Sequence, residues 1–479
     1  MKRIAIIGGG ISGLSAAFAL EQKRATGVPL EYTLFESSSR LGGVLLTERM
    51  DGCLIEAGPD SFLTEKPWAI DLCRQIGLAD QLIGSNDAQR KTYILVQGKL
   101  VVIPDGLMFM VPTKVLPTIF SRLFSLRTKL LMAREWFHVA SKAASDETVA
   151  SFVERHYGPE IVDRLVDPLL SGIYGGAASE LSVRAVLPRF AEMEANHGSL
   201  GRAMLWARNK TRQAPNAPPR PLFTSLKDGM QQMVDAVVAR LSPAALRINT
   251  PVLEIRRGQA DWFVSAGAQS DTFDGVIVAV PTQTAAPLLR SCSPALRAEL
   301  GGIHYSSPVT VTLGYDHNVR SSLPPGFGFL VPRSEGKRML AATFVHNKFP
   351  HRAPDNRALI RCFLGGTRDE ETLQSSDEEI LRIVREELRQ IIGVGAEPLF
   401  TRVFKWKRAM AQYNVGHLER LERIERMRQE LPALALAGNG YRGIGVPDCA
   451  RSGTDAASQL LITLGLTPAQ APAKVSQPA

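Results

Sequence analysis

The chain has 479 residues, of which 45% are hydrophobic and 22% charged. This composition is ordinary for a globular protein and excludes a disordered, collagen-like or coiled-coil chain. The length suggests about three domains or one elaborated domain, and no apolar run approaches the roughly 18 residues of a membrane-spanning helix. The five cysteines are far apart and form no Cys-x-x-Cys pair. We therefore expect no disulfide framework, no metal site and a reducing compartment.

The net charge of +9 is concentrated in one segment. Between Thr113 and Lys142 the chain has six basic side chains and one acidic side chain, Glu135. Such a basic patch suits a nucleic acid, an anionic membrane or an anionic substrate, and composition does not choose among them.

The first forty residues predict a βαβ unit. Its strand-like run begins at Ile4, so we expect no signal or transit peptide. The later pattern predicts mostly helix over 112–145 and 146–190, a proline-rich loop at 212–221, strands at 275–280 and 309–315, and an amphipathic helix at 377–392.

A glycine-rich loop follows the first predicted strand. Gly8, Gly10 and Gly13 satisfy the pattern G-x-G-x-x-G, which permits a tight turn, close approach of a pyrophosphate and close packing of helix on strand. Glu36 ends the next predicted strand, where a carboxylate can accept hydrogen bonds from ribose hydroxyls. The loop predicts a dinucleotide site.

Further motifs resemble the superfamily of FAD-dependent amine oxidases and protoporphyrinogen oxidases. Glu36 and Arg40 precede Gly42 and Gly43 in an E-x-x-x-R-x-G-G pattern that is similar to the second FAD fingerprint of this superfamily. The resemblance implies FAD bound through these residues: Gly8, Gly10, Ile11, Ser12, Gly13, Glu36, Arg40, Gly42, Gly43, Gly58, Pro59, Asp60, Ser61, Val252, Trp406, Gly438, Ile444, Gly445 and Val446.

The middle of the chain narrows the resemblance. The segments 167–176, 180–184, 326–332 and 364–366 resemble signatures of protoporphyrinogen oxidases and their coproporphyrinogen-oxidising bacterial relatives. This family removes six electrons from a porphyrinogen, with O2 as acceptor and H2O2 as product, in haem biosynthesis. The substrate is then protoporphyrinogen IX or coproporphyrinogen III, and the sequence does not decide between them. No catalytic side chain is implied, since the flavin performs the redox chemistry.

The resemblance also implies a flat apolar slot for the tetrapyrrole. Phe327, Leu330 and Phe363 match its lining positions. The family's cation for the substrate propionate aligns near Thr92, so we assign Arg90 and Lys91 to this role.

The implied fold is α/β, with a Rossmann-like FAD-binding domain, a mixed-sheet substrate domain and a helical membrane-facing region. We assign 1–85, 220–285 and 430–466 to the first, 86–112, 187–219 and 286–429 to the second, 113–186 to the third and 467–479 to a frayed tail. The expected location is cytoplasmic, with peripheral contact to an anionic membrane from the inner face as one option. A solvated helical face is the other option for 113–186. No nucleic acid is expected, and a homodimer is left open.

Two other functions remain open. A flavin amine oxidase or carotenoid desaturase shares the FAD motifs, and GDP-dissociation inhibitors share the implied fold as non-catalytic escort proteins. Glu36, Arg40 and the C-terminal glycines argue against an escort protein, because these residues are expected to bind a cofactor.

Overall fold

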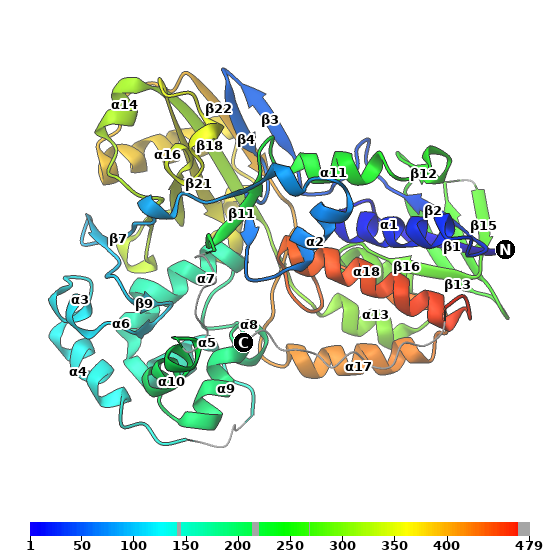
Figure 1. The fold of residues 1–479 in the computed structure, drawn as a ribbon, viewed down its shortest axis with the longest axis horizontal. Coiled ribbons are helices and arrows are strands. Elements are labelled where there is room, and N and C mark those ends of the chain that lie inside the picture. The colour runs from blue at the N-terminus through cyan, green and yellow to red at the C-terminus, as the bar shows by residue number, and fades with distance from the viewer. Residues whose placement is uncertain (141–144, 213–219, 268, 468–479) are drawn as a thin grey trace.

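A computed structural model describes residues 1–140, 145–212, 220–267 and 269–467. The predicted tail beyond residue 467 and most of the proline-rich loop lie outside the described residues. Figure 1 shows three parts: a sheet covered by α1 and α18, a second sheet with α14 and α16 beside it, and a group of helices below the second sheet.

The first part is a parallel five-stranded sheet. Its strands, in spatial order, are β12 (Leu246–Arg247), β2 (Leu30–Phe35), β1 (Lys2–Ile7), β16 (Gly275–Val278) and β24 (Leu434–Leu436). The central strands are apolar on both faces, as expected of a parallel sheet covered by other elements. Helices α1 (Ile11–Ala25) and α18 (Val446–Thr463) pack so closely that a methyl group on Gly453 would lie 1.9 Å from the Ser12 carbonyl oxygen. The predicted βαβ unit is therefore present.

The second part is a mixed seven-stranded sheet. Its order is β22 (Phe400–Lys405), β18 (Pro308–Asp316), β21 (Arg357–Gly365), β20 (Ala341–Phe344), β19 (Gly328–Leu330), β7 (Thr92–Val96) and β8 (Lys99–Val102). Helix α16 (Asp377–Ile392) covers one face, where Val384 and Leu388 pack with Val311 and Leu313 in one core. This helix has the residues that its amphipathic pattern predicts.

The third part is helical. It contains α3 (Val115–Phe120), α4 (Leu126–Glu135), α5 (Val149–Tyr157), α6 (Pro159–Ile161), α7 (Asp167–Tyr174), α8 (Val183–Val186), α9 (Pro188–His197) and α10 (Leu200–Arg212). Helix α10 is tied to α4, because the Leu200 amide donates to Glu135 Oε1 over 2.6 Å. Because of this contact we include α9 and α10 in the helical part, which was predicted to end at residue 186. No helix in the described ranges is long and apolar enough to cross a bilayer.

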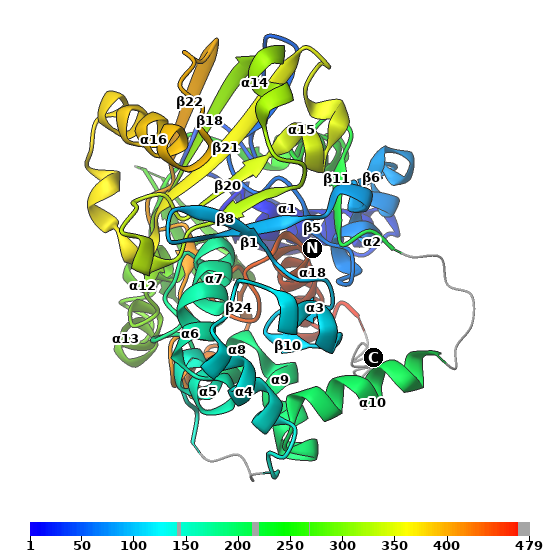
Figure 2. The same cartoon turned by 90° about the vertical axis from the view of Figure 1, so that its left-hand side faces the viewer.

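The remaining elements connect or cover these parts. The strands are β3 (Thr47–Met50), β4 (Cys53–Glu56), β5 (Phe62–Leu63), β6 (Leu82–Gly84), β9 (Leu107–Met108), β10 (Val111–Pro112), β11 (Phe223–Leu226), β13 (Val252–Arg257), β14 (Trp262–Ala266), β15 (Gln269–Phe273), β17 (Tyr305–Ser306) and β23 (Met410–Ala411). The helices are α2 (Trp68–Gln75), α11 (Gln231–Val238), α12 (Thr282–Leu288), α13 (Pro294–Gly301), α14 (His317–Ser322), α15 (Val345–Lys348) and α17 (His417–Gln429). In Figure 2, α7 lies directly below the second sheet.

Candidate cofactor and substrate site

The glycine loop joins β1 to α1. A methyl group on Gly13 would lie 1.9 Å from the Gly8 carbonyl oxygen, so only glycine lets the helix pack this closely on the turn. A methyl group on Gly10, by contrast, would meet nothing within 4 Å. No side chain caps the start of α1, so the first amides of the helix remain available to an anion. The loop therefore fits a pyrophosphate.

Glu36 lies beside this loop at the end of β2. Its carboxylate accepts hydrogen bonds from the amides of Gly9 (2.7 Å) and Ser38 (2.8 Å). The Ser37 and Ser38 hydroxyls also donate to Oε1, whereas Oε2 accepts only from Gly9 among the described residues, so Oε2 can still accept a ribose hydroxyl. The Thr250 amide donates to the Glu36 carbonyl oxygen over 2.8 Å. Val252, predicted to contact the adenine, thus begins β13 two residues from this contact.

The predicted second fingerprint continues from the loop. The Gly42 amide donates to the Gly9 carbonyl oxygen over 2.8 Å, and Gly43 lies against Gly10. Arg40 donates to the carbonyl oxygens of Leu41, Gly43 and Leu45. The guanidinium therefore fixes the shape of this loop, a role that the sequence pattern did not indicate.

The Ala57–Ser61 turn comes next along the same path. A methyl group on Gly58 would lie 1.9 Å from the Val44 carbonyl oxygen. The Ala57 carbonyl oxygen accepts hydrogen bonds from Trp406 Nε1 (2.8 Å) and Thr310 Oγ1 (2.9 Å). Within the described chain, the amides of Gly58, Asp60 and Ser61 have no hydrogen-bond partner. In this turn the Ala57 carbonyl oxygen is already hydrogen-bonded within the protein, while three backbone amides remain free to donate. A turn that lies against a ring rich in hydrogen-bond acceptors needs such free donors.

The C-terminal motif supplies a second helix start. Gly445 precedes α18, and Asp448 in its first turn accepts a hydrogen bond from Lys66 over 2.6 Å. Gly438 follows β24, and the nearest atom to a methyl group there would be 4.0 Å away. The predicted residues Ile444 and Val446 flank Gly445. Taken with the glycine loop and the free amides, these features fit an extended dinucleotide such as FAD.

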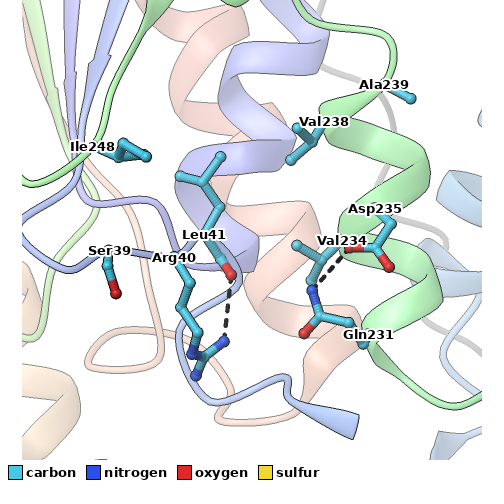
Figure 3. Close-up of a pocket in the computed structure, with 9 residues that line it drawn as sticks. All are labelled: Ser39, Arg40, Leu41, Gln231, Val234, Asp235, Val238, Ala239 and Ile248. Atoms are coloured by element: carbon cyan, nitrogen blue, oxygen red, sulfur yellow. Dashed lines mark hydrogen bonds between the residues drawn. The ribbon is translucent and has the colours of Figure 1, made fainter.

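A surface pocket of about 450 Å³ opens beside this path (Figure 3). Among the predicted cofactor residues only Arg40 lines it. The other lining residues are Ser39 and Leu41 of the same loop, Ile248, and residues of α11 and its C-terminal end. Within α11, Gln231 Nε2 donates to Asp235 over 3.0 Å. The glycines, rather than this pocket, mark the course of the cofactor.

Two of the predicted slot residues share a row across the second sheet. Phe363 pairs with Ala341, and Ala341 pairs with Leu330 in the adjacent strand. Leu330 also faces α7, since its Cδ2 lies 4.0 Å from where a methyl group on Gly172 would be. The row therefore faces the helical part, on the side of the sheet opposite α16.

Phe327 and the predicted cations lie about three residues along the strands from this row, because Leu330 pairs with Ile94 and Gly328 with Thr92. Phe327 is buried and precedes β19, and its amide donates to the Lys91 carbonyl oxygen over 2.7 Å. Arg90 and Lys91 are exposed, and neither forms an ion pair with another described residue. Both side chains are therefore free to meet a carboxylate near the slot.

The structure adds three cations that the sequence analysis missed. Lys348, Arg352 and Arg361 are buried behind the Ala57–Ser61 turn. Lys348 Nζ lies 3.0 Å from Asp60 Oδ2, and these cations together hold the pKa of Asp60 well below its ordinary value despite burial. A signal for Arg361 exists in the sequence, because it interrupts the apolar strand β21. Its partners come from a distant segment and could not be read from the pattern.

A group of possible metal ligands lies elsewhere, in the helical part. His138, His156 and Glu194 place ligand atoms within 4.8 Å of one another. Arg155 also donates to Glu194, and its Nη1 lies 3.4 Å from His156 Nε2. A guanidinium at this position competes with a metal ion for the same carboxylate oxygen.

Comparison with known proteins agrees with this geometry. A family model for flavin containing amine oxidoreductases matches residues 11–461. The chain is 34% identical to the coproporphyrinogen III oxidase of Bacillus subtilis (strain 168), over 97% of this chain and 98% of the relative. It is 30% identical to the mitochondrial protoporphyrinogen oxidase of Nicotiana tabacum, over 96% of this chain and 95% of that relative.

Solved structures show the same architecture. The crystal structure of an Exiguobacterium sp. 255-15 protein, provisionally named a protoporphyrinogen oxidase, has a TM-score of 0.85 and 30% identity, and the match covers 97% of this chain and 99% of that chain. Cyclohexylamine oxidase from Brevibacterium oxydans IH-35A has a TM-score of 0.67 with 17% identity, covering 97% and 99%. The second likeness concerns the fold alone.

Proposed function

The chain belongs to the flavin-containing amine oxidoreductase family and, within it, groups with the porphyrinogen oxidases, and from that premise we propose that it oxidises a porphyrinogen to the porphyrin in haem biosynthesis. The single observation that favours a porphyrinogen over another substrate is the apolar row of Phe363, Ala341 and Leu330, which faces α7 next to the cofactor path. In this proposal the row is the apolar surface on which one face of a flat tetrapyrrole lies.

In this proposal the protein binds and orients while FAD performs the redox chemistry. Bound FAD accepts two electrons and passes them to O2, so three turnovers convert one porphyrinogen and three O2 into one porphyrin and three H2O2. Leu330 and Phe363 hold the ring plane and exclude water, because apolar contacts cover both faces of the slot. Arg90 and Lys91 bind a propionate at the slot edge through charge-assisted hydrogen bonds.

The remaining cofactor residues take the roles that their contacts support. Glu36 binds the adenosine ribose, the start of α1 binds the pyrophosphate, and the free amides of Gly58, Asp60 and Ser61 face the flavin ring. Arg40 and Trp406 act on the cofactor through the backbone carbonyls that they hold.

Fluorescence-monitored turnover tests this function and its substrate together. Purified yellow enzyme is given coproporphyrinogen III and protoporphyrinogen IX in parallel, and porphyrin fluorescence and H2O2 are measured. We expect porphyrin from at least one of them with three H2O2 per porphyrin. A yellow protein that oxidises neither would indicate an amine oxidase or carotenoid desaturase, and a colourless protein would indicate an escort protein.

Two slot variants and one control variant test the slot. Phe363→Ala removes apolar contacts present before and during reaction and loosens the alignment of the ring, so KM should rise and kcat should fall. Phe327→Ala should do the same. Phe263→Ala alters an exposed residue of β14 and should change neither constant. Normal turnover of both porphyrinogens by Phe363→Ala and Phe327→Ala would remove the slot assignment and leave the flavoprotein.

We further propose that the helical part docks on an anionic membrane. Apolar side chains of α3 and α4 and of the segment after α4 are exposed, among them Phe120 at 81% and Phe137 at 78%. Arg122, Arg127 and Arg134 of the same segment are exposed, whereas its acid, Glu135, is buried. Apolar side chains inserted between lipids, with cations at the headgroups, match this pattern. Docking here also lets a porphyrinogen reach the slot from the bilayer side.

The domain division is part of the same proposal. The five-stranded sheet with its helices binds FAD, the seven-stranded sheet binds substrate, and the helical part, extended through α10, contacts the membrane. A homodimer is not required for any of these roles.

A further inference from the structure

Five charged residues are collected behind the Ala57–Ser61 turn. Glu56, Arg352 and Arg361 are at most 4% exposed, and the side chains of Asp60 and Lys348 are 16% and 11% exposed. We call these five residues the buried network. It contains three cations and two carboxylates.

Each carboxylate of the network has its own cation. Arg352 Nη2 lies 3.1 Å from Glu56 Oε1, and Lys348 Nζ lies 3.0 Å from Asp60 Oδ2. Arg361 has no ion pair in the described chain and donates instead to the carbonyl oxygens of Ala57 (3.4 Å) and Gly58. Arg361 is therefore the uncompensated charge.

Among the described residues, no further acid forms an ion pair with Arg361 or lines the cavity beside it. A cavity of about 10 Å³, room for one water molecule, lies inside the network, and its other lining residues are Leu54, Ile55, Thr312, Val345 and Leu359. The Nε atoms of Arg352 and Arg361 and the hydroxyl of Thr312 are buried without a hydrogen-bond partner. A water molecule can satisfy these atoms but brings no charge. With all five groups ionised, the network therefore holds one excess positive charge.

The position of Arg361 connects this charge to the site. Through Gly58 it holds the turn whose free amides face the proposed cofactor ring. On β21 it shares a face with Phe363 two residues away, and its guanidinium carbon lies 4.9 Å from the centre of the Phe363 ring. Arg361 thus lies where the cofactor path meets the slot, which is where the reactive ring of the flavin has to be.

We propose that the buried network raises the reduction potential of the bound flavin, because its excess positive charge stabilises the negative charge that the cofactor gains on reduction. Charges interact strongly at such a site, since little water screens them. Arg361 is a positioning residue in this scheme: it acts through the turn and through its field, without touching the reacting atoms. The inference rests on FAD as the cofactor and does not depend on which porphyrinogen is the substrate.

The test measures the potential of the bound flavin, by anaerobic reduction against a reference dye, in the full-length holoenzyme. Arg361→Gln removes the charge but keeps an N–H donor for the Gly58 carbonyl. We expect at least a tenfold fall in the equilibrium constant for reduction, about 30 mV for a two-electron couple. Arg361→Lys restores the charge and should stay within threefold of the parent. Arg389→Gln removes an exposed cation of α16, on the other face of the sheet, and should change nothing.

A second variant removes a negative charge instead of a positive one, and it distinguishes an effect of charge on the potential from an effect of structural damage. Asp60→Asn removes a carboxylate from the same network, so the potential should rise, whereas damage would move both variants the same way. Flavin content and the melting temperature are recorded for each. An unchanged potential in flavin-loaded Arg361→Gln overturns the proposal. If that variant loses its flavin, a potential that falls or stays constant in Asp60→Asn overturns it. If the parent enzyme oxidises neither porphyrinogen while these shifts are observed, the proposed function alone is refuted.

Discussion

Replacing Gly10 by alanine should remove FAD from a protein that still folds. Gly10 has φ −71° and ψ 176°, which any residue adopts, and the added methyl group would meet no protein atom within 4 Å. In the proposed cofactor path, the space that this methyl group enters holds the pyrophosphate. Fold and cofactor binding are therefore separable at this residue.

The expected magnitude follows from the contacts at stake. A hydrogen bond from a helix-start amide to a phosphate is charge-assisted and is worth about 1.5–3 kcal/mol. Displacing the pyrophosphate by the width of a methyl group breaks one or two such bonds, so affinity should fall by about 3 kcal/mol, on the order of 100-fold. Gly13→Ala is the contrasting variant. Its methyl group would lie 1.9 Å from the Gly8 carbonyl oxygen, so the helix must move and stability should fall by about 1–3 kcal/mol.

The assay compares flavin absorbance per protein with the melting temperature of the apoprotein. Gly10→Ala should lose flavin on dialysis and melt like the parent apoprotein, whereas Gly13→Ala should melt at a lower temperature. Gly395→Ala, which also adds a methyl group in open space but outside the predicted site, should change neither quantity. Full flavin occupancy in dialysed Gly10→Ala would refute the path assigned to the cofactor.

Three further expectations concern other parts of the molecule. Glu36→Ala should weaken FAD binding by about 1–3 kcal/mol, the worth of a hydrogen bond to a charged group, and tightly held flavin in this variant would remove Glu36 from the ribose site. Burial lowers the pKa of His346 to about 4 from 6.5, so the unfolded chain binds the proton more readily and stability should fall as the pH drops from 6.5 to 4, by about 3 kcal/mol. Urea unfolding across this range should show that slope, and His346→Gln should reduce it; equal slopes would contradict the assignment. Each cation near an anionic bilayer is worth about 1 kcal/mol, so a triple Gln variant of the helical part should no longer sediment with acidic vesicles while keeping its FAD. The triple variant changes Arg122, Arg127 and Lys129, and the matched control changes Arg382, Arg385 and Arg389 of α16. If the triple variant still sediments with the vesicles as the parent does, the alternative of a solvated helical face is favoured.

The sequence by itself determined the parts of this protein that are local. A glycine pattern of fixed spacing needs only one strand, one turn and one helix, so β1, Gly8–Gly13 and α1 follow from a few adjacent residues. The same holds for α16, whose apolar period predicted its residues, and for Gly445 before α18. The membership of the porphyrinogen oxidases was also visible in short motifs and is confirmed.

The tertiary structure decided what depends on residues far apart in the chain. Arg40, which was predicted to bind the cofactor, also donates to three nearby carbonyl oxygens, and no pattern specifies these contacts. Leu330 and Phe363 come into one row, on either side of Ala341, only through the register of β19, β20 and β21. The buried network joins Glu56 and Asp60 to cations almost 300 residues later. Periodicity reports which face of an element is apolar, but charge compensation in a buried site depends on which elements pack together, and that is fixed only when the whole chain has folded.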